Sequence, residues 1–113
     1  MRILAIEREI PLPARPDLRE ILREEAAGVW DLQKRGFIRD IWFTAPDRHA
    51  IVMLECADID EARQLLATLP LVRSGLIEFI LYELHSYDGF ERLFATGTDV
   101  APPSLKPKEP PEY

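Results

Sequence analysis

Residues 36–56 read GFIRDIWFTAPDRHAIVMLEC, and this stretch decides the fold. Two apolar runs, 37–44 and 49–56, flank a segment rich in turn-forming residues that contains Pro46 and Asp47. In the second run, positions 50, 52, 54 and 56 carry only small or apolar side chains, whereas the alternate positions are mixed. The stretch therefore predicts two adjacent strands, and we expect the uniformly apolar face of the second one to pack on helices.

A helical pattern precedes these strands. Apolar residues at helical spacing predict a helix from Asp17 to about residue 35. Asp17 is expected as the N-cap, and Glu20, three residues later, would complete a capping box. Gly36 follows two basic residues and is expected to end the helix.

A second helix, a loop and a further strand are predicted downstream. The helix should begin at Asp58 or Asp60, run through Thr68 and end before Pro70. Residues 71–75 are expected to form a loop that leads to a strand over about 76–86. Residues 87–94 then predict a short amphipathic turn or helix.

With a first strand expected over 2–9, the element order is β-α-β-β-α-β. This order predicts an α+β fold of the ferredoxin-like type, in which a four-stranded antiparallel sheet carries both helices on one face. We expect the other face to be too apolar for water and to be covered by a second copy, giving a homodimer or higher homo-oligomer. The residues expected on that open face are Ile3, Ala5, Ile51, Met53 and either Trp42 or Phe43.

Composition limits the class of protein. The chain has 113 residues, 47% of them hydrophobic, and a net charge of −6, which together fit one domain over 1–95 and a Pro-rich C-terminal tail over 96–113. The excess of acidic over basic side chains argues against nucleic acid as a partner. No apolar run is long enough to span a membrane, and the N-terminus does not resemble a signal peptide. We therefore expect a cytoplasmic protein.

Two segments resemble a known family. The sequence Gly-Phe-Ile-Arg-Asp-Ile-Trp at 36–42, after a helix ending in Lys-Arg, resembles the second strand of muconolactone isomerases. Leu-Pro-Leu at 69–71, followed by a glycine and an Ile-Glu strand, is similar to the same family. The resemblance covers about residues 1–94 and implies a dimeric α/β barrel. It also implies a pocket between sheet and helices or inside the barrel, partly covered by a neighbour's C-terminal segment.

The same resemblance implies a function. Muconolactone isomerases shift a double bond by moving a proton without a cofactor, so the expected activity is cofactor-independent proton transfer on a small organic acid or lactone. Two alternatives stay open on the sequence: a non-catalytic ligand-binding or assembly module of the same fold, and a cofactor-free monooxygenase.

Three residues are candidates for the acid or base of a proton transfer. Histidine as a residue type can both accept and donate a proton near neutral pH, which makes His49 a candidate, and Glu7 or Glu55 inside an apolar barrel would have a raised pKa. The alternative for His49 is an exposed position at the end of a turn. The alternative for each glutamate is an ion pair at the rim of the barrel.

Three others are candidates for substrate binding. Arg39, among apolar neighbours, would hold an acid group of the substrate or pair with a carboxylate at a dimer seam. Trp42 and Tyr82 would contact the substrate with their rings, although core or interface packing is the alternative for Trp42. No metal is expected, because two histidines and a lone cysteine offer no metal-ligand spacing.

Overall fold

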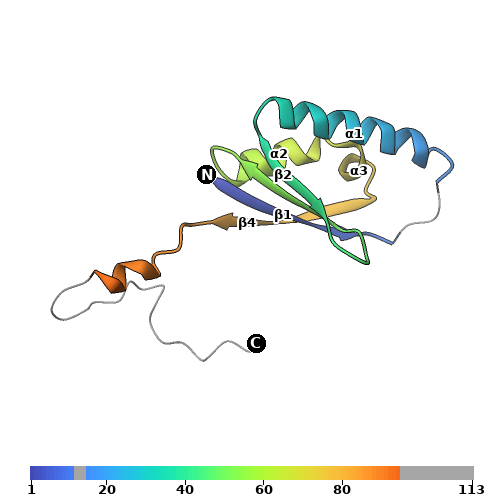
Figure 1. Cartoon of the computed structure of the whole chain (residues 1–113). Coiled ribbons are helices and arrows are strands. Elements are labelled where there is room, and N and C mark those ends of the chain that lie inside the picture. The colour runs from blue at the N-terminus through green and yellow to red at the C-terminus, as the bar shows by residue number, and fades with distance from the viewer. Residues whose placement is uncertain (12–14, 95–113) are drawn as a thin grey trace.

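The computed structural model describes residues 1–11 and 15–94. Its elements follow the predicted order, with one additional short helix, and a 3₁₀ helix lies within the turn or helix predicted over 87–94 (Figure 1). They are β1 (Arg2–Glu9), α1 (Leu18–Lys34), β2 (Ile38–Phe43), β3 (Ala50–Glu55), α2 (Ile59–Ala67), α3 (Pro70–Arg73), β4 (Ile77–Leu84) and η1 (Gly89–Leu93).

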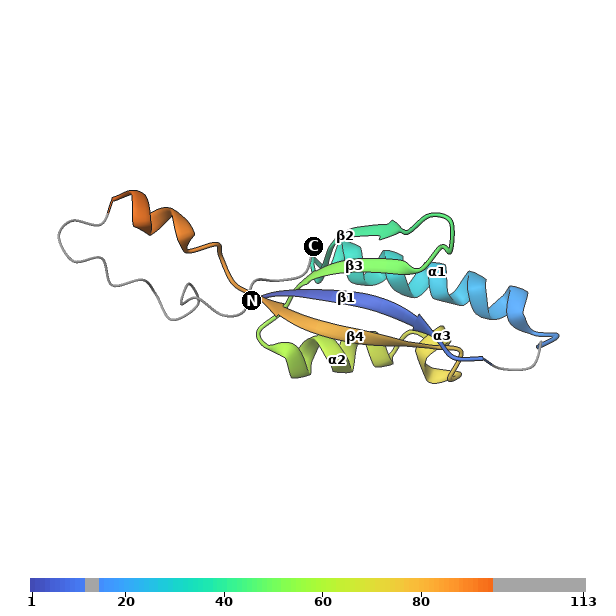
Figure 2. The same cartoon turned by 90° about the horizontal axis from the view of Figure 1, so that it is seen from below.

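The four strands form one antiparallel sheet in the order β2-β3-β1-β4. The three α-helices cover one face of this sheet, as Figure 1 shows from the side and Figure 2 from below. The predicted ferredoxin-like α+β fold is therefore confirmed. The tail predicted over 96–113 lies outside the described residues. Within the described part of the chain, no helix combines the length and the apolar character that crossing a membrane requires.

The ends of α1 agree only in part with prediction. Gly36, with a φ of +86°, takes the left-handed conformation that ends the helix, as expected. The capping box was wrong, because the Asp17 side chain makes no capping hydrogen bond. Asp17 instead forms a bidentate ion pair with Arg15, at 2.9 and 3.0 Å, which occupies both carboxylate oxygens.

Helix α2 begins as predicted, but the segment that follows it differs from the prediction. Asp58 caps α2 as expected, since its Oδ1 accepts the Glu61 N–H over 2.8 Å. The loop predicted over 71–75 was wrong, because Pro70 opens the short helix α3. Proline fits the first helical turn because its φ is already helical and its missing N–H has no partner there.

The core lies between the helices and one face of the sheet. The prediction of which β1 residues lie on the open face was wrong. Ile3 and Ala5 are fully buried beneath the helices rather than on the open face. Ile3 pairs with Leu54 and Ala5 with Val52, and directly opposed side chains in an antiparallel sheet share a face. Both faces of β1 are apolar, so alternation alone does not distinguish the inner one.

The open face is nevertheless strongly apolar. Trp42 lies opposite Ile51, and both point away from the helices, as expected. Phe43 lies opposite Ala50 and belongs to the helix-covered side. The apolar residues of the open face are Leu4, Ile6, Trp42, Ile51, Met53, Ile80, Tyr82 and Leu84. Beyond β4, η1 projects from the body of the molecule in both views (Figures 1 and 2).

Candidate active site

A cavity of about 610 Å³ lies between α1 and the helix-covered face of the sheet. Its wall is mostly apolar and comes from α1, β1, β2, β3, α3 and β4. Two carboxylates, Glu7 of β1 and Glu25 of α1, line it together with Arg48. Volumes of this size are typical of small-molecule sites, and a few polar groups in an apolar wall are their usual pattern.

Glu25 reaches the cavity because it occupies the inward stripe of α1. Buried Ile21 lies one turn before it and buried Leu32 seven residues after it. Its Oε1 accepts the backbone N–H of Leu71 over 2.9 Å. Burial raises the pKa of Glu25. The Leu71 hydrogen bond opposes this shift, and the nearby charges of Glu7 and Arg73 make smaller contributions that raise and lower the pKa respectively. Glu25 therefore holds a proton at a higher pH than an ordinary glutamic acid.

Glu7 enters from the opposite side of the cavity. The ladder between β1 and β3 ends where Ile6 lies opposite Ile51, which leaves the next β3 amide, that of Ala50, without a strand partner in β1. Glu7 Oε1 accepts this Ala50 N–H over 3.0 Å. The hydrogen bond orients the Glu7 side chain and engages one of its two carboxylate oxygens.

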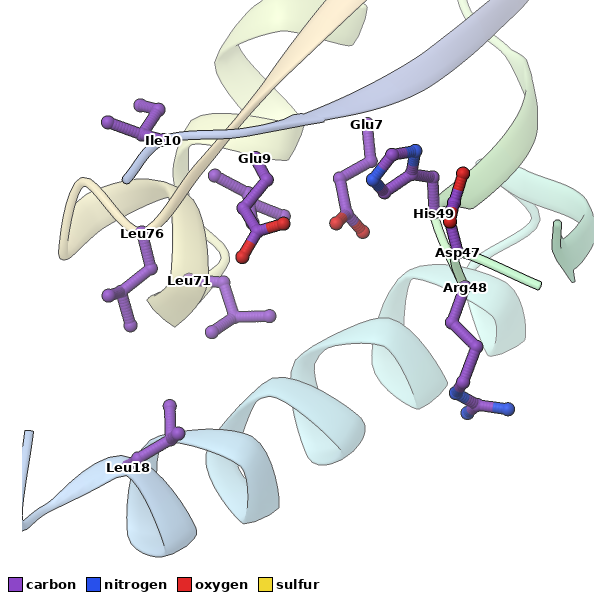
Figure 3. A pocket seen from close by; sticks show the side chains of 10 residues that line it. Glu7, Glu9, Ile10, Leu18, Asp47, Arg48, His49, Leu71 and Leu76 are labelled. Atoms are coloured by element: carbon purple, nitrogen blue, oxygen red, sulfur yellow. The ribbon is translucent and has the colours of Figure 1, made fainter. Parts of the chain in front are cut away.

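A second cavity of about 340 Å³ adjoins the first and shares Glu7 and Arg48 with it. Figure 3 shows Glu7 and Glu9 pointing from β1 into this space, with His49 and Arg48 on the side of the β2–β3 turn. The His49 N–H donates to Thr44 Oγ1 over 2.9 Å, which fixes the start of β3. The smaller cavity is therefore a polar extension of the larger one.

Arg48 stands where the two cavities meet. Its backbone is left-handed, with a φ of +56°, and its guanidinium carbon lies 4.5 Å from the centre of the Phe43 ring. Such stacking holds a guanidinium in place while leaving its N–H groups free to bind an anion. Arg48 can thus bind an acid group of a ligand at the edge of the larger cavity.

The structure brings together two of the six residues predicted for the site. Glu7 and His49 both line the smaller cavity. Trp42 and Tyr82 lie on the open sheet face, opposite Ile51 and Leu4 respectively. That face is separated from both cavities by the sheet itself.

The surroundings of Glu55 and Arg39 differ from those expected. Glu55 forms an ion pair of 2.6 Å with the amino group of Met1, and hydrogen bonding by that group lowers the pKa of Glu55. The raised pKa predicted for Glu55 was therefore wrong. Arg39 is exposed, and its Nε donates to the Gly36 carbonyl over 2.9 Å rather than to a carboxylate.

Sequence reasoning missed Glu25 and Arg48. A signal for Glu25 existed, because a glutamate at the fourth position after Ile21 interrupts the apolar stripe of α1. Arg48 had no comparable signal, since a charged residue in a turn is ordinarily solvated. Among residues 1–11 and 15–94, no three His, Cys, Asp or Glu side chains are placed to hold a metal ion.

Comparison with solved structures assigns the fold. Muconolactone isomerase superposes with a TM-score of 0.68 at 17% identity, over 78% of this chain and 92% of the other. The chain has the fold of muconolactone isomerase. In this muconolactone isomerase fold the larger cavity lies between sheet and helices, one of the two positions that the resemblance implied.

A second solved structure shares the fold. It is 5-chloro-2-hydroxyhydroquinone dehydrochlorinase from Burkholderia phenoliruptrix AC1100, in complex with 2,5-dihydroxybenzoquinone. The TM-score is 0.56 at 17% identity, over 79% of this chain and 98% of the other. No protein-family model and no curated protein sequence matches the chain.

Proposed function

We propose that the protein is a cofactor-independent isomerase that moves a proton on a small unsaturated acid or lactone. The observation that carries the proposal is the pair of carboxylates, Glu7 and Glu25, in one largely apolar cavity, with the pKa of Glu25 raised. A carboxyl group with a raised pKa beside a second, hydrogen-bonded carboxylate is an arrangement that proton-shuttling enzymes use.

In the proposed reaction, Glu7 acts as the base. Its carboxylate removes a proton from a carbon conjugated to the substrate carbonyl, and the C–H electron pair delocalises toward the carbonyl oxygen. Protonated Glu25 donates a hydrogen bond to that oxygen and so stabilises the developing charge. Glu7 then returns the proton to a different carbon. The double bond moves, both carboxyl groups regain their starting states, and no oxidant or reductant is consumed.

Arg48 and His49 complete the proposed site. The Arg48 guanidinium, stacked on Phe43, would bind a carboxylate of the substrate. His49, in the smaller cavity beside Glu7, would exchange protons with solvent. If the protein were instead a non-catalytic module of the same fold, its interior would be filled by side chains. The cavity of about 610 Å³ supports the enzyme.

Deuterium exchange tests the proposal directly. The full chain is incubated in D₂O with unsaturated lactones that include muconolactone, and proton NMR follows deuterium incorporation and the double-bond shift. Glu7→Gln and Glu25→Gln should each lower the rate about 100-fold or more. Glu24→Gln, exposed on the same helix, is the matched control and should react at the rate of the unmodified protein. Equal rates in all four proteins would exclude the assignment.

We also propose that a second copy of the chain covers the open sheet face. Trp42 is 53% exposed and Tyr82 is 48% exposed on this face, which is more apolar surface than an isolated subunit usually leaves in water. Charged side chains of both signs accompany them, including the ion pair between Arg8 and Glu78. A face with both signs of charge around an apolar centre is suited to self-association about a two-fold axis.

A further inference from the structure

The larger cavity has an apolar wall that the proposed proton transfer does not use. Four large side chains from α1 and β2 line this wall and remain accessible: Leu22 (49%), Trp30 (60%), Ile41 (36%) and Phe43 (56%). A cluster of large exposed apolar side chains is typical of a ligand groove or an interaction site. We therefore expect an occupant to cover this wall.

Trp30, Ile41 and Phe43 of the apolar wall come from positions along α1 and the sheet that differ from those of the two carboxylates. Glu7 belongs to β1, whereas Ile41 and Phe43 belong to β2, two strands away in the sheet. Adjacent strands are about 4.8 Å apart, so the β1 and β2 backbones are separated by about 10 Å. The Glu7 carboxylate spans part of this distance, because it accepts the Ala50 N–H of β3, and Ala50 lies opposite Phe43. On α1, Trp30 lies five residues beyond Glu25, or about 7.5 Å along the helix axis.

We propose that the substrate carries a ring-sized apolar substituent that packs between Trp30 and Phe43 while its reacting carbon lies between Glu7 and Glu25. This inference rests on the proposed function and names its substrate class: an amphipathic unsaturated acid or lactone. Arg48 is associated with both groups, because its guanidinium stacks on the Phe43 ring and it lines the same cavity as Glu7 and Glu25.

Three features favour a small molecule of this kind over a chain segment. The apolar wall belongs to the same cavity as the acid pair, so one ligand can contact both. The volume of about 610 Å³ is typical of sites for ligands larger than an unsubstituted lactone acid. Trp30 and Phe43 offer flat ring faces, which suit stacking on a planar substituent.

The two tryptophans provide a direct binding assay. Trp30 lines the cavity and Trp42 lies on the opposite sheet face, so Trp42→Phe leaves Trp30 as the only tryptophan of the chain. Muconolactone and a phenyl-substituted muconolactone are titrated into the full-length Trp42→Phe protein, and Trp30 fluorescence is recorded. We expect the phenyl compound to bind at least 10-fold more tightly and to change the emission of Trp30.

Trp30 variants test specificity separately from stability. Trp30→Ala should weaken binding of the phenyl compound at least 10-fold by calorimetry, a larger loss than it causes for muconolactone. Trp30→Phe should restore most of the preference, because it keeps a ring at the same place. Equal affinity for the two compounds in the unmodified protein would overturn the inference. So would Trp30 emission that depends on protein concentration and not on ligand, because a second copy would then occupy the wall.

The outcomes for substrate class and for catalysis are distinguishable. If muconolactone is isomerised and the phenyl group gives no gain in affinity or kcat/KM, the inference fails and the proposed function stands. If the phenyl compound binds tightly through Trp30 but neither compound exchanges deuterium, the proposed function fails. In that case the binding preference of the cavity is still established.

Discussion

Glu25 Oε1 accepts the Leu71 backbone N–H over 2.9 Å, and this hydrogen bond joins the middle of α1 to the first turn of α3. The same contact fixes the carboxyl group at the edge of the cavity, close enough to Glu7 for the Glu7 charge to raise the pKa of Glu25. One side chain therefore links the packing of the helices to the proton chemistry proposed for the site.

The first prediction concerns the pH dependence of activity. Because Glu25 acts as the protonated partner, kcat/KM should fall as pH rises through its raised pKa. Glu25→Gln should lower the rate about 100-fold and abolish this alkaline decline, because an amide does not titrate. The measurement is kcat/KM for muconolactone isomerisation between pH 4 and 9. An identical alkaline decline in the variant would assign it to another group.

The second prediction concerns stability. A group whose pKa is higher in the folded than in the unfolded state stabilises the fold at low pH, and this contribution is lost as pH rises through the folded-state pKa. The free energy of unfolding of the unmodified protein, relative to that of Glu25→Gln, should therefore decrease from about pH 4 toward neutrality. Urea unfolding of both proteins at several pH values measures this difference in the free energy of unfolding. Glu24→Gln, exposed on the same helix, should show no such trend.

The third prediction concerns self-association. Trp42→Glu places a charge at an apolar position of the open sheet face and should dissociate the proposed dimer to the 13.0 kDa subunit. Light scattering at micromolar concentration measures the mass. Trp30→Glu, on the other side of the sheet, should leave the mass unchanged. A 13.0 kDa species for the unmodified protein would contradict the dimer itself.

The fourth prediction concerns the core. Leu54 is fully buried at the centre of the inner sheet face. Leu54→Ala should lower the free energy of unfolding by about 2–5 kcal/mol, because it removes buried apolar volume and leaves a cavity. Leu93→Ala changes a side chain that is 74% exposed and should cost less than about 0.5 kcal/mol. Similar losses in the two variants by urea unfolding would be inconsistent with the assigned core.

The fifth prediction concerns the end of α1. Gly36 has a φ of +86°, so Gly36→Ala should destabilise the fold by about 1–2 kcal/mol, the cost of a left-handed conformation for an L-residue. A Cβ at this position would meet no atom within 4 Å, so the cost comes from the backbone and not from a clash. Gly36→Asn should recover part of the loss, because asparagine adopts this conformation more readily. Thermal unfolding of both variants distinguishes these effects.

Much of the fold was predictable from local patterns. The alternation at positions 50–56 identified the face of β3 that packs on the helices, and Gly36 identified the end of α1. The helical turn of α3 was missed because a four-residue helix has too few positions to show periodicity. The capping hydrogen bond predicted for Asp17 was wrong because Arg15, two residues earlier, binds the same carboxylate.

The candidate site was less predictable. Glu7 and His49 were identified by residue type, and the structure places both at one cavity. Glu55, Arg39, Trp42 and Tyr82 were chosen on the same grounds and lie outside both cavities. Residue type indicates what chemistry a side chain can perform, but it does not indicate which side of a sheet the side chain occupies.

The sequence by itself determined the order of the elements, because hydrophobic periodicity, turn residues and helix-ending glycine act over a few neighbouring positions. Tertiary structure alone decided which face of β1 is buried, since Ile3 and Ala5 are no more apolar than Leu4 and Ile6, and pairing with β3 sets the choice. Tertiary structure also decided which residues form the candidate site. Glu7 and Glu25 line one cavity only because α1 packs across the sheet, and the burial that raises the pKa of Glu25 exists only in the folded chain.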